Sequence, residues 1–210
     1  MLNVFLPVLF IAIVAFAGYY LKFLTISGGI AAFIVGILTA SGLGIKGLIL
    51  LGVFFATSSF WSKYKRIYKS KVEERHAKGA QRDWQQVAAN GGLAGLVSFL
   101  YLLEPDSLWI YAFSILIASS NSDTWASEIG TLSKRPPISI KTFTAASKGT
   151  SGAVSALGTI AAILGSILIA IMSFFLFKFN WDIVFFRGNE RHYFRGYSGY
   201  WIFRLENKKV

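Results

Sequence analysis

Two carboxylates lie in a polar stretch of this sequence, SSNSDTWASEIG at 119–130. If the stretch is helical, Asp123 lies one turn from Ser127 and Thr124 one turn from Glu128, because residues four apart share a helix face. The stretch follows an apolar run, and carboxylates at membrane depth usually mark a functional site. Since Mg²⁺ prefers hard oxygen ligands beside phosphates, Asp123 and Glu128 are predicted to form a magnesium site.

A simpler interpretation of the two carboxylates stays open. Both could emerge into water at the membrane boundary as a solvated helix end, paired there with Lys134 or Arg135. A solvated helix end does not require Asn, Ser, Asp, Thr and Glu to be concentrated within a turn and a half. Because they are concentrated here, the metal site is favoured.

Four further polar or glycine-rich clusters recur at the ends of apolar segments: TISGG at 25–29, ATSSFWSK at 56–63, QVAANGG at 86–92 and KGTSGAVS at 148–155. The first, third and fourth are predicted to open helices, whose free N–H groups attract phosphate. Lys78, Arg82 and Lys148 would add positive charge. The glycines have a second interpretation as helix contacts, since Gly91 and Gly95 form a G-x-x-x-G step.

The elements that must position these groups are membrane helices. The chain has 210 residues, is 54% hydrophobic and has a mean hydropathy of +0.55, which is too apolar for a soluble domain. We expect an all-α, polytopic integral membrane helix bundle of about six transmembrane helices. The expected spans are 2–21, 24–40, 44–60, 87–103, 108–120 and 151–177. The first is expected to be a helix and not a removable signal peptide.

The absence of cysteine limits the chemistry of any site. It excludes a disulfide, a thiolate nucleophile, an iron–sulfur cluster and a cysteine zinc site. His76 and His192 are the chain's two imidazoles, and they fall in unrelated segments. Any bound metal is therefore expected to have oxygen ligands.

Charge predicts the orientation in the membrane. Basic residues outnumber acidic ones in loop 61–86, so the positive-inside rule makes that loop cytoplasmic. Alternation then puts the N-terminus outside, loop 123–150 inside and every polar cluster at the cytoplasmic face. We expect a membrane domain at 1–177 and an aromatic and basic tail of uncertain order at 178–210.

These motifs together resemble a known family. SDTWASEIG at 122–130, QVAANGG, KGTSGAVS, Ser58-Ser59 with Lys63, and Lys78-Gly79 with Arg82 are similar to the polytopic membrane proteins related to transmembrane protein nineteen and to plant phytyl-phosphate kinase. The resemblance covers about residues 24–176. Members usually continue with further apolar spans, so the chain resembles a member that is truncated or altered after about Asn180.

The resemblance implies phosphate transfer to an isoprenoid-type lipid phosphate in the bilayer from a nucleoside triphosphate, with CTP as a candidate donor. Asp123 and Glu128 would hold Mg²⁺ and, with Lys148, would be the catalytic residues. Substrate phosphates would be bound by a larger set: Lys78, Arg82, Asn90, Gly91, Gly92, Thr124, Ser127, Gly149, Thr150 and Gly152.

Two other function classes stay open at this point. A carrier or flippase for an anionic lipid or solute would use Asp123 and Glu128 as a cation or proton site. Such sites lie near the midplane, whereas these residues lie near one face, which favours the enzyme. A membrane scaffold without chemistry would use the charges for orientation alone. No nucleic-acid partner is expected, and the oligomeric state is left open.

Overall fold

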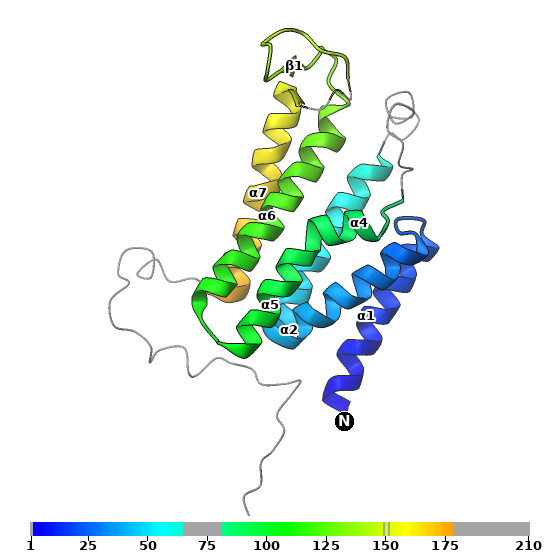
Figure 1. Cartoon of the computed structure of the whole chain (residues 1–210), viewed down its shortest axis with the longest axis vertical. Coiled ribbons are helices and arrows are strands. Elements are labelled where there is room, and N and C mark those ends of the chain that lie inside the picture. The colour runs from blue at the N-terminus through cyan, green and yellow to red at the C-terminus, as the bar shows by residue number, and fades with distance from the viewer. Residues whose placement is uncertain (1, 65–80, 149, 151, 179–210) are drawn as a thin grey trace, which may run out of the picture.

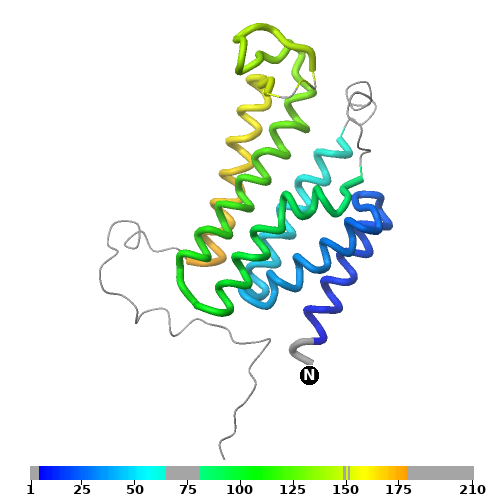
Figure 2. The backbone as a smooth tube through the Cα atoms, viewed as in Figure 1, coloured from blue at the N-terminus to red at the C-terminus, as the bar shows by residue number. Residues whose placement is uncertain are grey.

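The structure is a computed structural model that describes residues 2–64, 81–148, 150 and 152–178 (Figures 1 and 2). Its elements are α1 (Leu2–Tyr20), α2 (Ile26–Lys63), α4 (Trp84–Val87), the π-helix η1 (Ala88–Gly92), α5 (Leu93–Leu103), α6 (Ser107–Gly130), β1 (Ile138–Ser139), β2 (Ala153–Val154) and α7 (Ala156–Phe177). Three described helical stretches are long and apolar enough to cross a membrane: Ile26–Lys63, Trp84–Leu103 and Ala156–Phe177. The all-α membrane bundle is thus confirmed, with a short antiparallel β1–β2 pair added between α6 and α7.

Helix α2 supplies two spans because it reverses at Gly44. That residue has φ 59° and ψ −146°, a conformation that suits glycine. A straight helix of 38 residues would be about 57 Å long, yet Lys63 Nζ donates to Leu21 O, just before the start of α2, at 2.7 Å. We therefore treat α2 as a first arm (26–43) and a second arm (45–63), which matches the two spans expected there.

Several helix boundaries differ from those expected from hydropathy, because capping residues determine where helices begin. The fourth span begins at Trp84, and not at Val87, because Asp83 Oδ1 accepts from Gln86 N at 2.9 Å. The last span begins at Ala156, and not at Ser151, because Ser155 Oγ accepts from Gly158 N at 3.1 Å. The fifth span, which was expected to end at Ser120, continues to Gly130, so residues 123–130 belong to α6 and not to the expected loop 123–150.

Hydrogen bonds gather all the polar clusters at one end of the bundle, which we call the polar end. Thr25 N donates to Arg82 O at 3.0 Å, joining the start of α2 to the start of α4. Ser62 Oγ donates to Glu128 Oε1 at 2.6 Å, and Ser155 Oγ to Gly130 O at 3.3 Å. The N-terminal end of α1 and the last turn of α7 lie at the opposite end (Figure 1). That the polar end is cytoplasmic stays a prediction.

The core lies where α2, α5, α6 and α7 meet. Phe113, Ile117, Leu50 and Ile169 are fully buried there. α6 and α7 run side by side (Figure 2). Close backbone approaches tighten the bundle, and the tightest is at Gly42, where a Cβ would lie 1.7 Å from Ser98 O of α5. Helix contacts of this kind depend on small residues because hydrocarbon offers no hydrophobic drive between helices.

The orientation can be tested by single-cysteine labelling, because the chain contains no cysteine. We expect a membrane-impermeant maleimide to label Glu104→Cys in intact cells, and to label Lys134→Cys only after the membrane is opened. Glu104 precedes α6 and Lys134 follows it, so the two positions lie at opposite ends of the helix, and both are exposed. The reverse pattern would contradict the cytoplasmic placement of the polar end.

The backbone contact at Gly42 predicts a large effect of one added methyl group. Gly42→Ala should lower the free energy of unfolding by about 1–3 kcal/mol, because the first arm of α2 must move away from α5. Gly52→Ala is the matched control, since a Cβ there meets nothing within 4 Å, and should be neutral or slightly stabilising. Thermal unfolding in detergent measures both, and equal losses would refute the role of the contact.

Candidate functional site

The backbone of Arg82 is held by the loop that precedes α2. Its N–H donates to Phe23 O at 2.9 Å, and its carbonyl accepts from Thr25 N at 3.0 Å. A Cβ on Gly28 would lie 2.1 Å from that carbonyl, so glycine is required there for the close approach. Gly28 N is itself bonded to Thr25 Oγ1 at 3.1 Å. This helix N-terminus is therefore capped by its own residues.

The guanidinium of Arg82 reaches two serines on the second arm of α2. Nη1 donates to Ser59 Oγ at 3.2 Å and Nη2 to Ser62 Oγ at 3.3 Å. Ser62 in turn donates to Glu128 on α6 at 2.6 Å. Burial lowers the pKa of the Arg82 guanidinium, and the Glu128 carboxylate acts in the opposite direction. We name Ser59, Ser62, Arg82 and Glu128 the Arg82 cluster.

Asn121 sets the rotation of α6 that brings Glu128 into this cluster. It is fully buried, and its Oδ1 accepts from Thr57 Oγ1 and Ser58 Oγ, each at 3.2 Å. Its Nδ2 donates to Gly165 O of α7 at 2.8 Å. Asn121 was not among the site residues predicted from the sequence. An amide next to an apolar span is the signal that could have indicated it.

Asp123 differs from Glu128 in its surroundings. It is exposed, and it makes no hydrogen bond or ion pair with another described residue. The two carboxylates are separated by about 140° around the helix. The described part of the chain contains no group of three or more His, Cys, Asp or Glu placed to hold a metal ion. A magnesium site formed by both carboxylates stays a prediction.

The two hydroxyls expected beside Asp123 bond to their own helix. Thr124 Oγ1 donates to Ser120 O at 2.8 Å, and Ser127 Oγ donates to Thr124 O at 3.0 Å. Each keeps oxygen lone pairs for another donor or a cation. Ser120 Oγ donates to Asn90 O at 2.7 Å, which shows that this side of α6 faces η1.

The QVAANGG cluster does not open a helix, contrary to the sequence-based expectation. Asn90, Gly91 and Gly92 lie in η1, two turns after the start at Trp84. A Cβ on Gly91 would lie 3.3 Å from Val35, so this buried glycine serves helix contact. Single π turns inside α-helices often occur at functional sites, and this one directs Asn90 O to Ser120.

The KGTSGAVS loop covers the C-terminal end of α6. Lys148 Nζ donates to Thr131 O at 3.3 Å and also to Ser133 O. A cation there offsets the negative end of the helix dipole. Thr150 Oγ1 bonds with Ser147 Oγ at 2.9 Å, and Gly152 makes a turn with φ 75°. Gly149, Lys78 and the tail 178–210, apart from Lys178, lie outside the described residues.

The sequence matches a known family over most of its length. Residues 9–194 match the family described as integral membrane protein DUF92, and the chain belongs to that family. It is 36% identical to Protein PGR of Arabidopsis thaliana over an alignment of 166 residues. The alignment covers 72% of this chain and 57% of that protein. An uncharacterized membrane protein of Methanocaldococcus jannaschii is 32% identical over 178 residues, 84% of this chain and 73% of its own length.

A more distant relative is Protein VTE6, chloroplastic, of Arabidopsis thaliana. It is 28% identical over 158 residues, which are 73% of this chain and 47% of that protein. This chain therefore spans about half the length of the two Arabidopsis relatives. No solved structure matches it. The matches confirm the resemblance to a polytopic membrane family.

The Arg82 cluster predicts that Glu128 and Asp123 contribute unequally to stability. Glu128→Gln should lower the free energy of unfolding by about 1–3 kcal/mol, because a half-buried guanidinium loses its carboxylate. Asp123→Asn should change it by less than about 0.5 kcal/mol. Unfolding in detergent can be followed by the fluorescence of Trp61 and Trp125, whose rings lie 5.8 Å apart near the cluster.

A double-mutant cycle tests whether Glu128 acts through Arg82. The losses in Glu128→Gln and Arg82→Gln should add to more than the loss in the double variant, because each removes the same charge pair. Strict additivity would show that the two charges do not stabilise each other.

Proposed function

We propose that this protein transfers a phosphoryl group, with Mg²⁺, from a nucleoside triphosphate to an isoprenoid-type lipid phosphate at its polar end. The observation that carries the proposal is the contrast on α6 between Glu128, engaged with Ser62, and Asp123, exposed and without a partner among the described residues. An ionisable group that lies two turns before the end of a bundle helix and has no partner among the described residues is a functional candidate. The resemblance to the family that includes plant phytyl-phosphate kinase supplies the reaction class.

The residues present suit a magnesium ion held partly by the protein. Mg²⁺ usually keeps several waters and is bound by one or two carboxylates together with substrate phosphates. Asp123 would hold it, with the oxygen atoms of Thr124 and Ser127 on the same side of the helix. When bound, the ion offsets the charge that develops on the phosphate oxygens. Glu128, in this proposal, holds Ser62 and Arg82 in place.

Arg82 would bind phosphate oxygens. Among the described residues its side chain donates to Ser59 and Ser62 alone, one bond from each terminal nitrogen. A guanidinium has five N–H groups in a rigid fork, so three remain for a ligand. Because the guanidinium is held by two serines, one of which is bonded to Glu128, little side-chain entropy is lost when a phosphate binds.

The chemistry requires no separate nucleophile from the protein. A lipid monophosphate oxygen attacks the γ-phosphorus, the bond to the β–γ bridging oxygen breaks, and lipid diphosphate and nucleoside diphosphate leave. A phosphate monoester has a second pKa near about 6, so it is largely a dianion at neutral pH. Positioning and charge neutralisation supply most of the catalysis of such transfers. This suits a site that contains no cysteine and whose described residues include no histidine.

The test is transfer from γ-labelled CTP, and separately ATP, to geranylgeranyl or phytyl monophosphate in purified membranes at varied Mg²⁺. Asp123→Asn should reduce labelled lipid diphosphate by about 100-fold or more, since positioned charge at a transferring phosphoryl group is worth several kcal/mol. Asp106→Asn is the matched control. Asp106 is an exposed aspartate that caps α6 at the opposite end, through Leu108 N at 2.8 Å, and asparagine caps equally well.

Activity lost equally in both variants would point to a general effect on folding. Activity unchanged in Asp123→Asn would refute the role of that carboxylate. No transfer by the parent chain, alongside Mg²⁺-independent movement of an anionic lipid between leaflets, would favour a carrier.

A further inference from the structure

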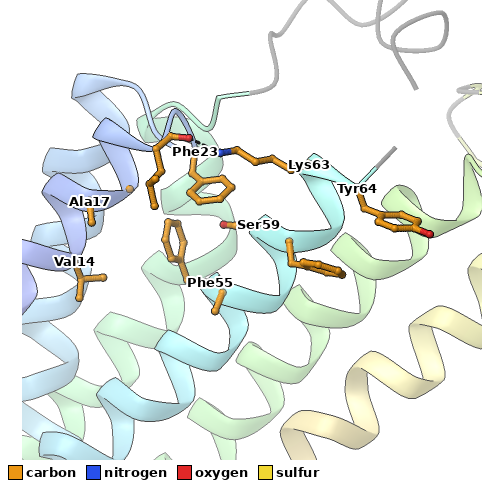
Figure 3. A pocket seen from close by; sticks show the side chains of 11 residues that line it. Val14, Ala17, Phe23, Phe55, Ser59, Lys63 and Tyr64 are labelled. Carbon is orange, nitrogen blue, oxygen red and sulfur yellow. Dashed lines mark hydrogen bonds between the residues drawn. The ribbon is translucent and has the colours of Figure 1, made fainter. Parts of the chain in front are cut away.

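A groove runs along the surface between α1 and the second arm of α2, and it approaches the polar end (Figure 3). Its volume is 590 Å³. The walls are apolar side chains over most of their length, among them Val14 and Ala17 of α1 and Phe55 and Ala56 of α2. Ser59 and Lys63 lie in its wall nearer the polar end. The groove is thus apolar along its body and cationic at one end.

The ammonium of Lys63 is not neutralised by a carboxylate within the described residues. Nζ donates to Leu21 O at 2.7 Å and lies 4.0 Å from the centre of the Phe23 ring. An ammonium has three donors, so two N–H groups remain for a ligand. The carbonyl and the ring hold the side chain over the groove without removing its charge, and this is the arrangement that an anionic headgroup requires.

Ser59 connects this groove to the Arg82 cluster. Its side chain lines the groove, and its hydroxyl accepts from Arg82 Nη1 at 3.2 Å. The Arg82 guanidinium carbon also lies 5.9 Å from the centre of the Phe55 ring, another wall residue. A headgroup held near Lys63 and Ser59 would therefore lie beside the guanidinium assigned above to phosphate binding.

We propose that this groove binds the acceptor of the reaction, with the hydrocarbon chain between α1 and the second arm of α2 and the phosphate between Lys63 and Arg82. The inference rests on the proposed function for the identity of the acceptor. Surrounding lipid tails are as apolar as the groove walls, so burial gives little selectivity inside a membrane. Selection depends on the headgroup instead.

Charge favours a lipid monophosphate over an ordinary phospholipid. A phosphate monoester carries about −1.5 to −2 at neutral pH, whereas a phosphodiester headgroup carries a single negative charge. Lys63 and Arg82 outnumber the one carboxylate, Glu128, so the site carries a net positive charge, and it attracts a dianion more strongly than a monoanion. A monoester also has three unsubstituted oxygens where a phosphodiester has two, so it can accept a bidentate contact from Arg82 and still offer an oxygen to Lys63.

A second cavity of 220 Å³ offers the alternative position for the chain. It lies among α1, the two arms of α2 and η1, and its polar end includes Arg82, Gln86 and Asn90. No lysine lines it, and the sole cation in its wall is Arg82, which the groove also approaches. The larger groove has a second cation at its mouth, and for that reason we assign the acceptor to it.

The experiment is photo-crosslinking of the full chain in nanodiscs with geranylgeranyl monophosphate that carries a diazirine on its terminal isoprene unit. We expect adducts on Ala17 and Ala56, which line the groove and not the second cavity, and we expect unlabelled geranylgeranyl monophosphate to displace them. Geranylgeraniol, which lacks the phosphate, should compete at least about tenfold less well, because charge-assisted hydrogen bonds to the headgroup are lost.

Four variants sharpen the test. Ala56→Trp fills the groove at an exposed wall position and should reduce labelling about tenfold or more, while Ala170→Trp, at an exposed position of α7 outside both cavities, should leave it unchanged. Lys63→Gln should weaken competition by the monophosphate about tenfold, and Lys63→Arg should restore it. The positions of the adducts on the unmodified chain test the proposal without any substitution. The misfolding of a variant would therefore not decide the result.

The outcomes separate this inference from the proposed function. Adducts in the groove together with no phosphoryl transfer would uphold the groove and refute the enzyme. Adducts on Ala32 and Ile49 in the second cavity, or none on any peptide, would overturn the groove even where transfer is observed. Equal competition by phosphatidylglycerol would also overturn it, because the groove would then be an unselective lipid site.

Discussion

The polar end depends on the way in which one arginine is held. The backbone of Arg82 bonds to Phe23 and Thr25, and its side chain bonds to Ser59 and Ser62, so it joins the start and the end of α2 to the loop before α4. Through Ser62 the same network reaches Glu128 on α6. A half-buried charge network of this kind adds little net stability compared with apolar residues. Its benefit is a guanidinium in a fixed place.

Three polar residues of helix α6, Asn121, Asp123 and Glu128, differ in their surroundings. Asn121 is buried and fixes the rotation of the helix against α2 and α7. Glu128, two turns later on about the same side, is then directed to Ser62. Asp123 lies on another side and is exposed. A single amide buried in an apolar bundle therefore favours the rotation in which Glu128 contacts Ser62 and Asp123 is exposed.

The sequence was sufficient to predict the class of fold and the gathering of the polar clusters at one end. Hydropathy and charge are properties of whole segments, so they survive errors of several residues at each boundary. The caps at Asp83 and Ser155 were not anticipated, because hydropathy does not register a hydrogen bond from a side chain to the backbone. The expected fifth span ended at Ser120, because hydropathy falls in the polar stretch. The spacing of Asp123 and Glu128 was derived on the condition that the helix continues, and α6 meets this condition by running to Gly130.

The candidate site was harder to predict because its members differ in what else they contact. Gly91 and Lys148 look like phosphate ligands in the sequence, yet Gly91 lies against Val35 and Lys148 donates to carbonyls at the end of α6. Spacing along a chain shows which residues share a face, but not which partners occupy that face. That information comes from packing between helices distant in sequence, such as Arg82 against Ser59.

In the proposed site, Ser59 would link lipid binding to phosphate binding. Its hydroxyl is the described partner of Arg82 Nη1 and also part of the groove wall. A phosphate that enters from the groove meets Lys63 and Ser59 before it reaches the guanidinium, and it can take over the Nη1 donor with a stronger, charge-assisted bond. Glu128 still holds Ser62, and Ser62 still holds Nη2, so the guanidinium keeps its orientation during that exchange. The proposed site would thus exchange a serine for a phosphate without moving the charge that binds it.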